Sequence, residues 1–113
     1  MPSKSARGPL HEIRQHIQLA SSFVEGYTFE NFKADRRTVY ATIRCLEIIS
    51  EASRRLPDEF KARHPEIPWP NIAAAGNVYN HKYEDVADIW SGARSRKALG
   101  PLFTAVDSEF RRA

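Results

Sequence analysis

The sequence contains a single cysteine, Cys45, among its 113 residues. One cysteine excludes a disulfide within the chain and is typical of proteins that fold in a reducing cytoplasm. Cys45 stands among Ile43, Leu46 and Ile48 in a helical pattern, so we interpret it as a small buried hydrophobic side chain. We therefore expect a cytoplasmic protein.

Long apolar runs are also lacking, and none is long enough to cross a bilayer. The first eight residues carry positive charge with no apolar segment behind them, so we expect no signal peptide. A composition of 42% hydrophobic and 27% charged residues is typical of a soluble globular protein. We expect one domain over residues 1–113, with residues 1–8 flexible.

No alternation typical of strands, no internal repeat and no glycine-rich phosphate loop is present. Apolar residues instead recur at spacings of three and four, which predicts helices. We expect helices over residues 10–27, 32–56 and 69–83, with Gly8-Pro9 opening the first of them. A short turn is expected at 58–63. A last helical segment begins at about residue 86, and Gly100-Pro101 bends or breaks it. The predicted fold is an all-α, mostly antiparallel bundle of four main helices plus a short connecting turn.

The second expected helix has an unusually wide apolar seam, which Tyr40 and Cys45 extend. Arg44 falls inside this seam and would need a partner if buried. The net charge of +3 is mild, and it permits a nucleic-acid partner without requiring one.

The four histidines are His11, His16, His64 and His81, and none has the spacing of a zinc site. We therefore predict no metal and no cofactor. We expect His64 to be an exposed structural residue of a loop.

Polar groups gather in the stretch from Ile67 to Tyr83, where an alanine-rich run favours helix. Asn77 and His81 stand four residues apart, so they share a helix face. A histidine there is either a general acid or base near neutral pH or a structural residue with satisfied hydrogen bonds. Both interpretations remain open on spacing alone.

The ordered combination of three segments resembles the HepT-like proteins of the HEPN superfamily. The segments are Phe32-x-x-Asp35-x-x-Thr38-x-Tyr40-Ala41, then Arg44-x-Leu46-Glu47-Ile48-Ile49-x-Glu51-Ala52-x-Arg54-Arg55-Leu56-Pro57, then Pro65-x-Ile67-Pro68-Trp69-x-x-Ile72. Gly76-Asn77-x-x-x-His81-x-Tyr83 and Val86-x-x-x-x-x-Trp90 follow at the family's separations. The resemblance covers residues 10–106.

This resemblance implies a small helical homodimer that cleaves RNA without metal, at a cleft between the two copies. It also implies a toxin whose antitoxin partner is a minimal nucleotidyltransferase. On the family pattern, His81, Asn77 and Asn80 are the catalytic candidates. Tyr83, two residues after the histidine, is the position where the antitoxin attaches AMP, although an ordinary half-buried tyrosine is the alternative.

The sequence departs from the family at the arginine that normally precedes the histidine by four to six residues. Gly76 stands there, and Asn80 occupies the position where some relatives place an arginine. An amide cannot replace the charge and donor geometry of a guanidinium. Arg44 or Lys82 would have to bind the phosphate instead. The alternatives are an inactivated, dimerising module that binds the nucleotidyltransferase, and a non-specific nucleic-acid binder.

Overall fold

The computed structural model describes residues 4–79, 86–94 and 99–112 of the chain. These residues form helices, turns and no strand, so the predicted all-α class is confirmed. The helices are α1 (Lys4–Val24), α2 (Phe29–Ala34), α3 (Arg36–Arg54), α4 (Asp58–Arg63), α5 (Trp69–Tyr79), α6 (Val86–Arg94) and α7 (Leu99–Arg112). Within the described ranges, no helix has both the length and the apolar character needed to cross a membrane.

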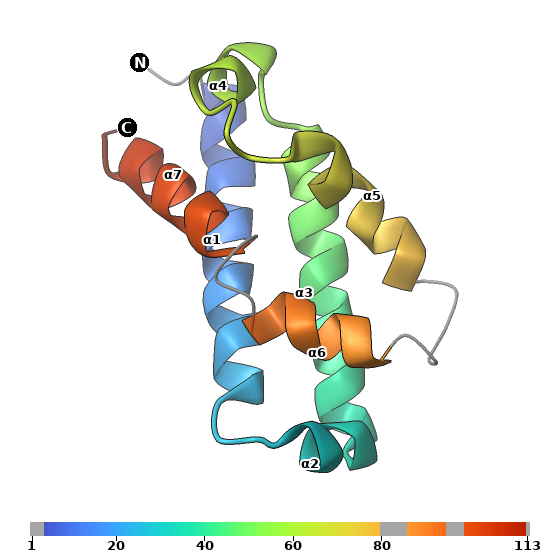
Figure 1. Cartoon of the computed structure of the whole chain (residues 1–113). Coiled ribbons are helices and arrows are strands. Elements are labelled where there is room, and N and C mark those ends of the chain that lie inside the picture. The colour runs from blue at the N-terminus through green and yellow to red at the C-terminus, as the bar shows by residue number, and fades with distance from the viewer. Residues whose placement is uncertain (1–3, 80–85, 95–98, 113) are drawn as a thin grey trace.

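The two longest helices, α1 and α3, run antiparallel and form the centre of the molecule (Figure 1). Helix α5 packs against α3, and α7 packs against α1. Helix α6 contacts α1, α2, α3 and α7, and it crosses the lower half of the α1–α3 pair. The last segment, which we predicted Gly100-Pro101 to bend or break, is two helices with different neighbours, and Gly100-Pro101 lie in the first turn of the second.

Helix α1 buries the predicted apolar stripe, formed by Leu10, Ile13, Ile17, Ala20 and Val24. It ends as predicted near Gly26, whose φ of 79° is a left-handed conformation that glycine adopts without strain.

The predicted start of α1 at Gly8-Pro9 is wrong, because the helix begins at Lys4 and contains Pro9. Residues 4–8, which we expected to be flexible, are helical. Pro9 removes one backbone donor from an early turn of α1, and its ring is buried against the core. Packing of this ring offsets the lost hydrogen bond.

The predicted continuous helix over residues 32–56 is also wrong, because the chain breaks at Asp35. Asp35 has extended backbone angles, and its carboxylate accepts a hydrogen bond from the backbone N–H of Thr38, which makes it the N-cap of α3. The hydroxyl oxygen of Thr28 caps α2 in the same way, because it accepts a hydrogen bond from the backbone N–H of Asn31. The two helices meet at an angle because each has its own cap.

Pro57 ends the α3 region and precedes α4, which confirms the predicted short turn. Helix α5 begins at Trp69, as predicted, with Pro70 in its first turn. Pro101 likewise stands in the first turn of α7. The core joins all of these elements through side chains such as Phe32, Phe60, Ile89 and Leu102, each 1% exposed or less.

Candidate active site

Helix α5 carries the start of the polar stretch singled out in the sequence. Asn77 lies in its last turns, but its side chain is outside the part of the structure that is described. Asn80, His81, Lys82 and Tyr83 lie outside the described residues altogether. The roles predicted for these five residues therefore stay predictions, and the structure describes only the position of α5 that precedes them.

Two side chains hold α5 in place by donating hydrogen bonds to backbone carbonyl groups. The fully buried hydroxyl of Ser50 on α3 donates to the carbonyl oxygen of Ala73 at 2.8 Å. The indole N–H of Trp69 points at the carbonyl oxygens of His64, at 3.1 Å, and Lys61, at 3.3 Å. These contacts lie within the first five residues of α5, so they tie the N-terminal half of the helix to α3 and to the α4 region.

Arg44 lies on the surface of α3, with a side chain that is 68% exposed. The expectation that it falls inside the apolar seam is wrong. The next two residues, Cys45 and Leu46, are buried as predicted, whereas Tyr40 is 56% exposed and does not widen the seam. Arg44 pairs with Glu47 at 3.6 Å, an exposed contact between neighbours on the helix. Its guanidinium is accessible to a phosphate, and phosphate binding by Arg44 remains a prediction.

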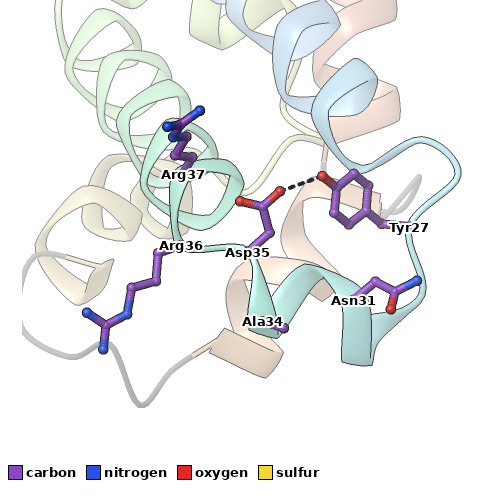
Figure 2. A pocket seen from close by; sticks show the side chains of 6 residues that line it. All are labelled: Tyr27, Asn31, Ala34, Asp35, Arg36 and Arg37. Atoms are coloured by element: carbon purple, nitrogen blue, oxygen red, sulfur yellow. Dashed lines mark hydrogen bonds between the residues drawn. The ribbon is translucent and has the colours of Figure 1, made fainter.

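A hydrogen-bonded cluster centred on Asp35 lies where α2 meets α3 (Figure 2). The Tyr27 hydroxyl donates to Asp35 Oδ2 at 2.6 Å, and the Thr38 hydroxyl donates to the same oxygen at 2.9 Å. These two side-chain hydrogen bonds, together with backbone N–H groups, outweigh the opposing effect of burial and hold the pKa of Asp35 below its ordinary value. Asp35 is therefore an ionised cap rather than a general acid.

An open surface hollow of about 650 Å³ adjoins this cluster, lined by Tyr27, Asn31, Ala34, Asp35, Arg36 and Arg37. The two arginines extend in different directions from the first turn of α3 (Figure 2). The sequence analysis missed this arrangement. The available signal was Asp35-x-x-Thr38, an N-cap pattern that should have separated α2 from α3.

His64 is half-buried rather than exposed, so that expectation is wrong. Its ring packs on Phe60 with centroids 5.0 Å apart, and its Nε2 lies 3.6 Å from Glu109 Oε1. Glu109 also accepts a hydrogen bond from Arg63 Nε at 2.9 Å. Burial raises the pKa of Glu109, but the hydrogen bond and charge of Arg63, with His64 and Arg112, hold it below its ordinary value. This cluster ties α4 to α7.

Among the described side chains, no three histidine, cysteine, aspartate or glutamate groups converge as metal ligands would. His81 lies outside those residues, so the prediction that the site uses no metal stays a prediction.

Residues 13–97 match a protein family described as ribonuclease HepT-like. The chain is 40% identical over 89 residues to a "Probable ribonuclease HepT" of Thermococcus cleftensis, covering 77% of this chain and 81% of that protein. It is 38% identical over 80 residues to a "Putative RNase" of Caldanaerobacter subterraneus subsp. tengcongensis, covering 71% of each. A "Putative RNase" of Methanocaldococcus jannaschii is 35% identical over 83 residues, covering 74% of this chain and 69% of that protein. No solved structure matches the chain.

Proposed function

Because the chain belongs to the ribonuclease HepT-like family, we propose that it is an endoribonuclease. The observation that carries this proposal is the match over residues 13–97, a range that contains Asn77 and His81. The relatives named as ribonucleases support the same substrate class, RNA.

We propose that the 2′-hydroxyl of the RNA attacks the adjacent phosphorus, without metal. The 5′-oxygen of the next nucleotide leaves, and the products are a 2′,3′-cyclic phosphate and a 5′-hydroxyl end. This reaction needs a base for the 2′-hydroxyl proton, an acid for the leaving oxygen and positive charge near the phosphorane. His81 performs one or both proton transfers, while Asn77 and Asn80 orient the imidazole or hold the phosphate. A homodimer that brings two copies of α5 together would supply two histidines to one cleft.

The positive charge has to come from elsewhere than α5, because residues 69–81 contain no lysine or arginine. We assign it to Lys82 or to Arg44, whose exposed guanidinium is described above. Incubating the protein with RNA in EDTA, beside His81→Ala, tests the cleavage. Cleavage by the parent protein and not by His81→Ala supports the proposal. Equal inactivity of the two proteins removes the claim of catalysis for this chain.

A second candidate function follows from the missing arginine. Gly76 and Asn80 leave the motif without its guanidinium, so the fold would persist as an inactive, dimerising module that binds a minimal nucleotidyltransferase. Asn80→Arg separates the two candidates, since an arginine offers the charge and donors that an amide lacks. A gain of RNA cleavage identifies a site that is complete except for that cation. No gain, together with co-elution of the chain and the nucleotidyltransferase, favours the binding module.

The wider setting we propose is a cytoplasmic toxin–antitoxin system in which the nucleotidyltransferase attaches AMP to Tyr83. The added phosphodiester charge and purine would repel and block the RNA phosphate at the rim of the cleft. Intact-mass analysis after incubation with that enzyme and ATP, beside Tyr83→Phe, tests this assignment. A mass gain that persists in Tyr83→Phe places the modification on another residue, and no gain in either protein leaves Tyr83 a structural residue.

A further inference from the structure

The first half of α3 combines three arginines with an exposed tyrosine. Residues 36–46 include Arg36, Arg37, Tyr40 and Arg44, and they contain no aspartate or glutamate. Tyr40 has the most exposed large apolar side chain described in the protein, at 56%. Arg37 and Arg44 are exposed as well.

Arg37, Tyr40 and Arg44 form one ridge along α3, because residues three and four apart lie on the same side of a helix. We call these three residues the α3 ridge. The ridge spans the eight residues 37–44, and seven steps of about 1.5 Å each give it a length of about 10 Å. Val39 and Thr42, on the other side of the helix, are fully buried and face the core. The ridge therefore points to solvent from one of the two central helices.

Positive charge in the first turn of α3 does not favour the helix itself. Arg36 and Arg37 occupy the first turn of α3, where the helix dipole disfavours positive charge. The carboxylate of Asp35, which precedes them, accepts hydrogen bonds from the Tyr27 and Thr38 hydroxyls. The Arg44–Glu47 pair is exposed and 3.6 Å long, so it contributes little. Residues that oppose local stability on a rigid surface are expected at functional positions.

We propose that the α3 ridge binds a single strand of RNA, with Tyr40 stacking on an unpaired base and Arg37 and Arg44 contacting phosphates on either side. This inference rests on the proposed function, from which it takes RNA as the substrate, and it adds where the strand lies outside the cleavage site. Aromatic rings flanked by cations bind single strands, whose bases are free to stack.

The hollow beside α2 lies at the N-terminal end of the ridge, and Arg37 belongs to both. Arg36 and Asn31 add a cation and an amide to its lining, groups that contact phosphate and sugar in nucleic-acid complexes. A strand lying along the ridge could therefore continue over this hollow without being blocked by the described parts of the protein.

Binding is measured by fluorescence anisotropy with a labelled single-stranded RNA whose 2′-hydroxyls are methylated, so that the strand cannot be cleaved. We expect Tyr40→Ala to weaken binding about tenfold, the order of one lost base stack. Tyr40→Phe keeps the ring and should retain most of the affinity. The double variant Arg37→Gln/Arg44→Gln should reduce the slope of log affinity against log salt by about 1.4, or about 0.7 for each phosphate contact.

Arg54→Gln, an exposed arginine at the other end of α3, is the matched control and should leave the slope unchanged. The inference is overturned if the parent protein does not bind the strand, or if Tyr40→Ala binds it like the parent. A third pair of results also overturns the inference: Tyr40→Ala halves the molecular mass in light scattering, and the arginine variants keep the parental salt slope. Together these results would identify the ridge as a protein interface.

These outcomes are independent of cleavage. Loss of binding in the ridge variants supports the inference even if the parent protein never cleaves RNA. Cleavage by the parent together with unaltered binding by the ridge variants refutes this inference and leaves the proposed function standing.

Discussion

Replacing Glu109 by glutamine tests whether a buried ion pair holds α7 onto the end of the bundle. The Glu109 side chain is 8% exposed, and its Oε1 accepts a hydrogen bond of 2.9 Å from Arg63 Nε. The same oxygen lies 3.6 Å from His64 Nε2. Arg63 itself is 47% exposed, so water screens one partner of the pair.

The expected loss lies between two limits. Breaking a fully buried pair costs about 3–5 kcal/mol, whereas an exposed pair contributes about 0–1 kcal/mol. Because the carboxylate is buried and the guanidinium is half in water, and because glutamine still accepts a hydrogen bond, we expect Glu109→Gln to lower the free energy of unfolding by about 1–2 kcal/mol at pH 7. Urea unfolding followed by circular dichroism measures this difference. Glu59→Gln, an exposed carboxylate on α4, is the control.

The pH dependence identifies the charge as the cause. The pKa of Glu109 lies below its ordinary value of 4.5 in the folded protein, so its contribution is fully present above pH 4.5. It is lost as the pH falls through the folded pKa. The deficit of Glu109→Gln should therefore shrink between pH 7 and pH 3. A deficit that is the same at both pH values would refute the ion-pair explanation and would leave side-chain packing as the cause.

Three further predictions concern the core, the packing of α5 against α3 and the N-cap of α3. Phe32→Ala removes a fully buried ring that lies 5.1 Å from Trp90 between centroids. It should lower the free energy of unfolding by about 3–5 kcal/mol in urea melts, and a loss below about 1 kcal/mol would contradict this packing. Ser50→Ala removes the donor to the Ala73 carbonyl and should cost about 1 kcal/mol. Amide hydrogen exchange in α5 should become faster, and an unchanged exchange rate would mean that this hydrogen bond does not hold the helix in place. Asp35→Asn keeps the cap oxygen but not the charge, and the pKa of Asp35 is lowered in the fold. Thermal unfolding should therefore favour the parent protein at pH 7, by a difference that narrows as the pH falls below 3.8. A difference that does not narrow there would show that charge is not the cause.

The helical fold could be predicted because its signal is local. The stripe of Leu10, Ile13 and Ile17 repeats at the period of a helix, and the structure buries all three residues. The break at Asp35 was missed because the apolar period continues from Phe32 to Val39 across it. The cap pattern Asp35-x-x-Thr38 was present in the sequence but was weaker than that periodicity.

The tertiary contacts of charged residues could not be predicted in the same way. Arg63 and Glu109 are 46 residues apart, and nothing in either local sequence indicates the other. His64 was therefore expected in solvent, although Phe60 and Glu109 cover it. The candidate catalytic role of His81 rests on family resemblance, because spacing alone left both a catalytic and a structural role open.

The missing arginine connects the cleavage site to the α3 ridge. Helix α5 brings no cation to the candidate site, and α3, against which it packs, presents Arg44 on its surface. Arg44 could stabilise the phosphorane or bind the strand before reaction, and kinetics separates these roles. A cation that acts only in the transition state lowers kcat and kcat/KM equally when it is removed, whereas one that binds the strand throughout raises KM and leaves kcat unchanged. The α3 ridge requires the second pattern for Arg44→Gln. Equal losses in kcat and kcat/KM would instead give Arg44 the role of the family's arginine, which Gly76 replaces here. Tyr40 and Arg37 would then have to bind the strand without Arg44.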